Sequence, residues 1–346
     1  MQYYYIGWDI GGAHLKAVVL NSHHDVIAVY QYPCPLWQGL DKLHEAVHFI
    51  LAQLPPGEHR HALTMTGELT DLFFGRDDGV RQILAAMAEN LGGEVTVYAG
   101  QSGLLKLADI ASVHYPSIAS ANWLASAALA AQHVDCSLFV DIGSTTTDIL
   151  AINYGKVIAA GYTDYERLIS QELIYTGVVR TPVMAVAQTV LDEGREIGVM
   201  AEFFAAMADV YRLTGELKPT HDQHGTADGA AKTTAASAVR LARMIGCDYC
   251  ESDLPRWRDL AINLRQQQLH RIKLACGKQL QRINTPEKAV LVGAGIGRFL
   301  AQEIARDLAL IYRDFADFFP GNMEGTDYDV TDCAPAAAVA SLLAKM

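Results

Sequence analysis

Short apolar runs alternate with longer amphipathic stretches along the chain, a pattern that predicts strands alternating with helices. The first two apolar runs, YYIGWDI and HLKAVVLN, are joined by GGA and predict a hairpin, and VIAVYQY predicts a third strand. The next expected elements are the helix LDKLHEAVHFILAQL, the strand HALTMTGEL, the helix GVRQILAAMAENLG, the strand EVTVYAG and a helix over 117–133. The alternation predicts an α/β architecture.

The same pattern restarts near residue 138. LFVDIGS, TTDILAIN and KVIAAGYT reproduce the opening hairpin and its third strand, and Asp141-Ile142-Gly143 repeats Asp9-Ile10-Gly11 after 132 residues. A repeat of this length is too long for a solenoid and predicts two related lobes. We expect them to span residues 1–134 and 135–346, with the site in a cleft between them.

The second half is expected to be largely helical. Helices are predicted over 198–215, 229–246 and 258–283, followed by the strand KAVLVGAG and the helix RFLAQEIARDLAL. The sequence leaves open whether the terminal helix, residues 334–346, packs back across the lobes.

Composition restricts the classes of partner. The chain has 346 residues, 51% of them hydrophobic and 19% charged, which is typical of a folded globular protein. Its net charge of -12, with no block of Lys and Arg, argues against nucleic acid or an anionic membrane as partner. No signal peptide is evident at the N-terminus and the six cysteines have no framework spacing, so we expect a cytoplasmic protein with reduced thiols.

A zinc site is one interpretation of two short motifs. Cys247 and Cys250 form a CxxC, and His221 and His224 form an HxxH. These are zinc ligand types. The HxxH lies in a polar stretch and a long helix is expected before the CxxC, so we favour four unliganded side chains while leaving metal binding open.

The two repeated hairpins carry the candidate chemistry. Backbone N–H groups at a glycine turn, here at Gly11, Gly12 and Gly143, can bind phosphate oxygens, and the hydroxyls of Ser144 and Thr145 add neutral donors. Asp9 and Asp141 end the first strand of each hairpin, where a carboxylate can hold Mg²⁺ directly or through water. The alternative is that both aspartates cap turns; their matched repetition favours a magnesium–diphosphate site.

A third glycine cluster lies in VLVGAGIGRF, at Gly293, Gly295 and Gly297. A strand, a glycine loop and a helix resemble a dinucleotide fingerprint. That fingerprint belongs near the start of a domain, so its late position here argues against a dinucleotide fold.

In this order, the three glycine motifs resemble the phosphate 1, phosphate 2 and adenosine motifs of the actin/hexokinase/Hsp70 superfamily. TGVVRTPV and DIGSTTTDI resemble its hydantoinase/oxoprolinase branch. WDIGGAHLKAV, TGELTD, ANW, YTGVVRTP and ADGAAKT are similar to a small family linked to tetrahydromethanopterin-dependent one-carbon metabolism, whose characterised activity is the ether-forming step of methanofuran biosynthesis.

The resemblance implies a two-lobed actin-like ATPase (ribonuclease H-like) fold and a transferase. An aminomethyl-furanylmethyl diphosphate would react with the phenol of a tyramine- or tyrosine-derived partner, and diphosphate would leave. Asp9 and Asp141 would hold Mg²⁺, and the hairpin glycines and hydroxyls, with Gly293, Gly295 and Gly297 of the adenosine motif, would form the ligand-binding loops. The phenol acceptor and the oligomeric state are left open.

Three further residues are candidates for catalysis. Lys16 and Arg180 would neutralise anionic charge, although an exposed strand lysine is the alternative for Lys16. Glu68, after an apolar strand and a glycine, would be the general base, or else would cap the next short helix. Trp123 is predicted to be a core residue, with stacking on an aromatic substrate as the alternative.

Two other classes of function stay open. One is an ATP-dependent kinase or hydantoinase/oxoprolinase-like hydrolase, favoured by the retained adenosine motif; whether ATP binds is left open. The other is a non-catalytic nucleotide sensor. A DNA-binding regulator would carry a basic helix-turn-helix, and the acidic chain argues against one.

Overall fold

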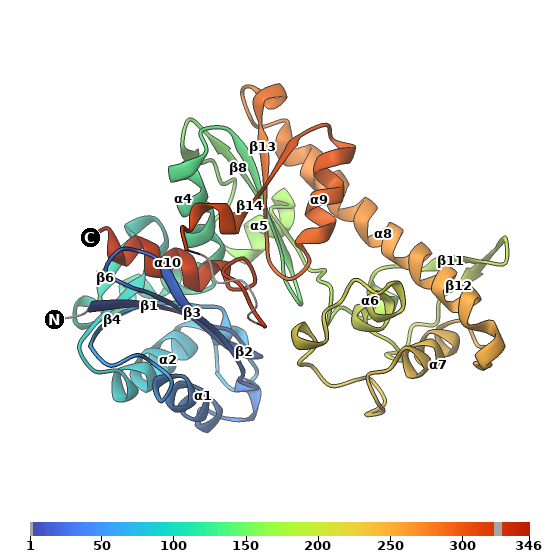
Figure 1. The fold of residues 1–346 in the computed structure, drawn as a ribbon, viewed down its shortest axis with the longest axis horizontal. Coiled ribbons are helices and arrows are strands. Elements are labelled where there is room, and N and C mark those ends of the chain that lie inside the picture. Colours follow the sequence, from blue (N-terminus) through green and yellow to red (C-terminus); the bar gives the residue numbers. More distant parts are fainter. Residues whose placement is uncertain (1–2, 322–326) are drawn as a thin grey trace. The chain divides into compact units, whose positions relative to one another are not determined.

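The computed structural model describes residues 3–321 and 327–346. The chain divides into two compact units (Figure 1). The first unit comprises Met1–Ser137, Leu150–Arg167 and Arg313–Met346, and the second comprises Leu138–Ile149 and Leu168–Tyr312. The expected division into lobes 1–134 and 135–346 stays a prediction. No helix of the described residues is long and apolar enough to cross a membrane.

The first unit is built on a six-stranded sheet with the order β3-β2-β1-β4-β5-β6. Its strands are β1 (Tyr3–Ile10), β2 (His14–Leu20), β3 (Val26–Pro33), β4 (Glu58–Met65), β5 (Glu94–Tyr98) and β6 (Leu104–Lys106). β4 is parallel to β1 and β5, whereas β1, β2 and β3 form an antiparallel meander. The predicted opening hairpin and third strand are confirmed.

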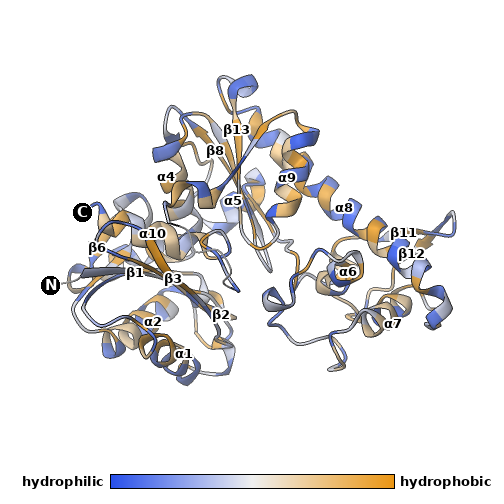
Figure 2. Ribbon diagram, viewed as in Figure 1, coloured by the Kyte–Doolittle hydropathy of each residue, from blue (hydrophilic) through white to orange (hydrophobic). Residues whose placement is uncertain are grey.

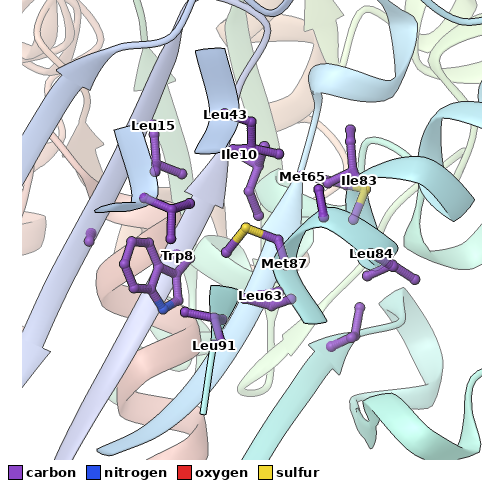
Figure 3. Packing of buried hydrophobic residues seen from close by; sticks show 14 of the residues in the cluster. Trp8, Ile10, Leu15, Leu43, Leu63, Met65, Ile83, Leu84, Met87 and Leu91 are labelled. Carbon is purple, nitrogen blue, oxygen red and sulfur yellow. The ribbon is translucent and has the colours of Figure 1, made fainter. Parts of the chain in front are cut away.

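One face of this sheet is covered by α1 (Asp41–Leu51) and α2 (Arg76–Asn90). Side chains alternate along a strand, so Trp8 and Ile10 point to this side. Figure 3 shows them packed with Leu43, Leu63 and Met87. Burial of these large side chains contributes about 1.5–3 kcal/mol each.

The opposite face of the sheet is covered by α10 (Ala334–Ala344), which packs on β1, β2, β4 and α4 (Asn122–His133). Gly7 makes this approach possible: a Cβ there would lie 1.9 Å from the carbonyl oxygen of Ala336. The terminal helix therefore packs within the first unit. Figure 1 shows this helix, in red, beside the blue first strands.

A second sheet has the order β10-β8-β7-β13-β14, with β9 paired to β8. Its strands are β7 (Ser137–Ile142), β8 (Thr147–Asn153), β9 (Lys156–Val157), β10 (Leu173–Ile174), β13 (Val290–Ala294) and β14 (Ile311–Asp314). The remaining elements are α3 (Tyr115–Ile118), α5 (Asp164–Ser170), the hairpin β11 (Thr189–Asp192) and β12 (Arg195–Gly198), α6 (Met207–Thr214), α7 (Thr234–Met244), α8 (Leu254–Leu280) and α9 (Arg298–Asp307).

Helix α8 shows why the long helical prediction succeeds. Its buried residues recur every three or four positions, including Trp257, Leu260, Leu264 and Ile272, and Figure 2 shows hydrophobic and hydrophilic colours alternating along it. This spacing places the apolar side chains on one helix face. The helix spans Leu254–Leu280, close to the expected 258–283.

Three element predictions are wrong. The expected helix 198–215 is helical only over Met207–Thr214, because the preceding residues bond to another segment: Val183 N donates to Ala205 O at 3.0 Å and Met207 N to Thr181 O at 2.8 Å. The expected third strand KVIAAGYT contains only the two-residue β9. The helix over 117–133 is broken at Ser120, whose φ of 50° is left-handed.

Candidate active site

The internal repeat appears as two hairpins with the same turn. In the first hairpin Gly11 N donates to His14 O at 3.0 Å, and in the second Gly143 N donates to Thr146 O at 2.9 Å. Asp9 and Asp141 each lie one residue before the end of the first strand. The sequence repeat is thus a structural repeat, with one copy in each unit.

Asp9 lies in a row of polar side chains across the first sheet. The strand register pairs Asp9 with Lys16 on β2 and with Thr64 on β4, and Lys16 pairs with Gln31 on β3. Directly paired residues project to the same face. Here that face is the one covered by α10, because Gly7, two residues before Asp9, contacts α10.

Some polar side chains of this row have hydrogen-bond partners in the described part of the chain and others do not. Lys16 Nζ donates to the carbonyl oxygen of Asp332 at 2.8 Å, and Asn122 Nδ2 donates to Asp9 Oδ1 at 3.5 Å. Within the described residues, the buried atoms Thr64 Oγ1 and Gln31 Oε1 have no hydrogen-bond partner. Lys16 is therefore not an exposed strand lysine. The Asp9 carboxylate and the Thr64 hydroxyl beside it are oxygen groups of the kind that bind a hydrated Mg²⁺.

Glu68 is fixed in a buried turn of the same unit. It is 1% exposed, lies in the 3-10 helix Gly67–Leu69 and accepts a hydrogen bond at Oε1 from Ser120 Oγ at 2.6 Å. Its backbone abuts α2, since a Cβ on Gly79 would lie 2.7 Å from Glu68 O. The carboxylate thus bonds to Ser120, and the alternative of a helix cap at Glu68 is wrong.

Burial raises the pKa of Glu68. The Ser120 hydrogen bond and the charge of Arg76 lower it in part, and Asp164 raises it. Arg76 and Asp164 pair with each other at 2.6 Å. Among the described residues, no group donates to the buried Glu68 Oε2. A carboxylate with one free oxygen and a raised pKa has the character of a general base.

The second hairpin is supported by the segment after β10. Val178 N donates to Gly143 O at 3.0 Å, Arg180 N donates to Ser144 O at 2.8 Å, and Gly177 N donates to Thr181 Oγ1 at 2.8 Å. Gln268 of α8 bonds in turn to Thr176 and Gly177. The TGVVRTP motif therefore fixes the turn of the second hairpin through backbone hydrogen bonds.

Gly143 has no packing reason to be glycine. A Cβ there would meet its nearest atom, Thr146 O, at 3.5 Å, an ordinary contact, and its φ is not left-handed. Among the described residues nothing fills the space beside it, so a glycine at this point is suited to close approach of a ligand to the backbone. The Ser144 and Thr145 hydroxyls lie 3.3 Å apart at the same turn.

Arg180 is half-buried next to this hairpin. Burial lowers the pKa of its guanidinium, and Tyr175 offsets this in part. Burial and the charge of Arg180 also lower the pKa of His224. The nearby buried charges pair among themselves: Arg240 and Arg212 both bond to Asp209.

The late glycine loop packs against the second hairpin. Gly295 has φ 80°, and a Cβ there would lie 2.3 Å from Asp141 Oδ1; Gly297 N donates to Ile142 O at 2.8 Å. A Cβ on Gly293 would lie 2.6 Å from the Tyr312 ring. Close packing is therefore a sufficient reason for these glycines, and their role in ligand binding stays a prediction.

The remaining motifs have local partners. Trp123 is 3% exposed, with the Arg167 guanidinium 3.9 Å from its ring centre, so it is a core residue as predicted. Asp228 bonds to Arg240 and Arg243 in a turn before α7. Cys250 Sγ lies 3.2 Å from Ser252 Oγ. Across residues 3–321 and 327–346, no three His, Cys, Asp or Glu side chains are grouped as metal ligands would be.

The candidate residues thus form two clusters, one in each unit. The first-hairpin cluster comprises Asp9, Gly11, Gly12, Lys16 and Glu68, and the second-hairpin cluster comprises Asp141, Gly143, Ser144, Thr145, Arg180, Gly293, Gly295 and Gly297. That Asp9 and Asp141 face each other across a cleft stays a prediction. Ser120, Asn122 and Asp332 were missed, because each is far in sequence from the residue that it contacts.

Both sheets and their hairpins define an α/β fold of the actin-like ATPase class. A solved acetone carboxylase, in its nucleotide-free form, matches with a TM-score of 0.57 at 10% identity, covering 98% of this chain and 70% of that one. At this identity the likeness concerns the fold alone.

The chain belongs to the hydantoinase/oxoprolinase family, whose model matches residues 60–318. It is 28% identical over 341 residues to the (4-{4-[2-(gamma-L-glutamylamino)ethyl]phenoxymethyl}furan-2-yl)methanamine synthase of Methanocaldococcus jannaschii, covering 98% of this chain and 97% of that protein. The synthase of the same name from Methanococcus vannielii is 32% identical over 118 residues, covering 34% of this chain and 53% of that protein. This full-length relationship to a named enzyme supports an enzymatic role.

Proposed function

We propose that the protein is a transferase that forms a phenoxymethyl furan in methanofuran or methylofuran biosynthesis. Its substrates are an aminomethyl-furanylmethyl diphosphate and the phenol of a tyramine- or tyrosine-derived partner. The observation that carries the proposal is the full-length similarity to a synthase whose name describes such an ether. The two hairpins support it, because both offer glycine turns suited to a diphosphate group.

In the proposed reaction the phenol oxygen forms a bond to the exocyclic carbon of the furan, and the bond from that carbon to diphosphate breaks. Diphosphate leaves with the electron pair, and the phenol proton passes to the free oxygen of Glu68. The furan ring stabilises positive charge on the reacting carbon. Catalysis then depends on orienting the phenol and on stabilising the departing anion.

Each cluster supplies part of this chemistry. Gly11, Gly12 and Gly143, with the Ser144 and Thr145 hydroxyls, bind diphosphate oxygens; Lys16 and Arg180 contribute positive charge. Asp9 and Asp141 are the carboxylates for Mg²⁺, which when bound neutralises diphosphate charge. The Thr64 hydroxyl, which is paired in register with Asp9 and has no hydrogen-bond partner among the described residues, supports this assignment.

The test is an assay of the purified protein with Mg²⁺, the furan diphosphate and either tyramine or γ-glutamyltyramine. Diphosphate release and the ether product, followed by mass spectrometry, are expected to appear in equal amounts. Titration calorimetry with ATP, ADP and diphosphate distinguishes the transferase from the kinase alternative. Magnesium-dependent ATP binding without ether formation would refute the transferase.

Substitutions in the two hairpins test whether they form the magnesium and diphosphate site. Asp9→Asn and Asp141→Asn are expected to lose magnesium-dependent diphosphate binding. Gly143→Ala should block diphosphate at an unchanged melting temperature, because its methyl group fits the fold but occupies the ligand's space. Gly198→Ala, on β12 with open space around it, is the matched control and should retain binding.

A further inference from the structure

The break between α3 and α4 has a backbone conformation that the local sequence does not require. Ser120 has φ 50°, in the left-handed region where residues other than glycine, asparagine and aspartate are uncommon. Strained residues persist where the surroundings hold them and are concentrated at functional sites. Ser120 is 7% exposed, and its strained backbone places its hydroxyl against a buried carboxylate.

That hydroxyl contacts one oxygen of Glu68 only. Ser120 Oγ donates to Oε1 at 2.6 Å, whereas the buried Oε2 has no donor among the described residues. Two residues later Asn122 Nδ2 reaches Asp9 Oδ1 at 3.5 Å. One short segment at the start of α4 therefore contacts the two carboxylates to which the proposed function gives different tasks.

We propose that Ser120 is a positioning residue: its hydroxyl binds one oxygen of Glu68, leaves the other free to take a proton from the acceptor substrate, and ties this base to the segment that holds Asp9. This inference rests on the proposed function for the identity of the acceptor. The placement of Glu68 by Ser120 is independent of that identity.

The hydroxyl has a specific electrostatic consequence. A hydrogen bond donated to a carboxylate stabilises its charged form. The other charged groups near Glu68 are Arg76, at the start of α2, and Asp164, at the start of α5, which act in opposite directions and pair with each other. Among the groups that favour ionised Glu68, the Ser120 hydroxyl contributes most, followed by the backbone N–H of Glu68 and by Arg76. Without the Ser120 hydroxyl, Glu68 would stay protonated to higher pH.

The first measurement is a carboxyl ¹³C NMR titration of the full chain labelled at glutamate, with Glu68→Gln assigning the resonance. In Ser120→Ala the Glu68 titration is expected to move up by about one pH unit, the scale of one lost hydrogen bond to a charged group. Ser120→Gly removes the same hydroxyl while relieving the backbone, and should give the same shift. Ser126→Ala is the matched control, because Ser126 is a buried serine of α4 whose hydroxyl has no partner among the described residues.

The second measurement is the pH profile of ether formation in the same variants. The acid limb of kcat/KM should move upward with the NMR titration, with KM for the furan diphosphate unchanged. An unmoved Glu68 titration in both Ser120 variants would overturn the inference, even if their melting temperatures fell. A shifted titration in a protein that forms no ether would sustain the placement by Ser120 and refute the proposed reaction.

Discussion

Because of the buried side chain of His61, we expect the first unit to lose stability when the pH is lowered from 7 to 5. The side chain is 2% exposed on β4, and its Nδ1 accepts a hydrogen bond from Trp8 Nε1 at 3.1 Å. Burial, with a smaller contribution from His59, lowers the pKa of His61 from 6.5 to about 4. The folded protein therefore holds the neutral imidazole, and protonation would place an unpaired charge in the core.

The direction follows from proton linkage. Between pH 6.5 and about 4 the unfolded chain binds a proton at His61 that the folded chain does not, so the stability is full above pH 6.5 and falls as the pH is lowered through this window. A shift of about 2.5 pKa units corresponds to about 3 kcal/mol in total. Between pH 7 and pH 5 the loss is about 2 kcal/mol.

The assay is urea unfolding at both pH values, followed by tryptophan fluorescence, since three of the four tryptophans, Trp8, Trp37 and Trp123, belong to the first unit. His61→Gln keeps an acceptor for Trp8 but does not titrate. Between pH 7 and pH 5, the loss in its free energy of unfolding should therefore be smaller than that of the wild type by about 2 kcal/mol. The exposed His23→Gln is the control and should match the wild type. Equal losses in the wild type and His61→Gln would refute the reasoning.

Three further substitutions have defined outcomes. Gly177→Ala places a methyl group 2.4 Å from Thr145 N and should destabilise the second hairpin by about 1–3 kcal/mol; an unchanged melting temperature would contradict the packing described. Asp209→Ala leaves the fully buried Arg240 without its main partner and should lower the free energy of unfolding in urea by about 3–5 kcal/mol. A smaller loss would argue against the ion pairs described for Asp209. Glu68→Gln should lower the rate of ether formation by about 10²–10⁴-fold while calorimetry shows unchanged diphosphate binding; a near-normal rate would eliminate Glu68 as base.

The fold was largely predictable because local patterns determine most of its elements. The opening hairpin, its repeat in β7 and β8, and the long helix α8 follow from apolar periodicity. The errors arise where tertiary contacts override local preference. Residues 198–206 have helix-forming composition, yet their backbone bonds to the segment around Thr181 and Val183.

The candidate site was predictable only in part. Asp9, Gly143 and Glu68 stand at strand ends or glycine turns, which sequence alone reveals. Ser120 contacts Glu68 across 52 residues of sequence, and Asp332 contacts Lys16 across 316. No local pattern encodes such pairings, and the left-handed φ of Ser120 is equally invisible in a run that reads as helix.

The packing of α10 on the first strand has a consequence for biosynthesis of the chain. The helix over Gly7 spans Ala334–Ala344, and the carbonyl that holds Lys16 belongs to Asp332. Because α10 is synthesised after β1 and after the residues between them, one face of β1 stays uncovered until Ala334–Ala344 have been made. The packing of β1 is thus completed only by α10, and a nascent chain that stops before Ala334 carries an unfinished first-hairpin cluster.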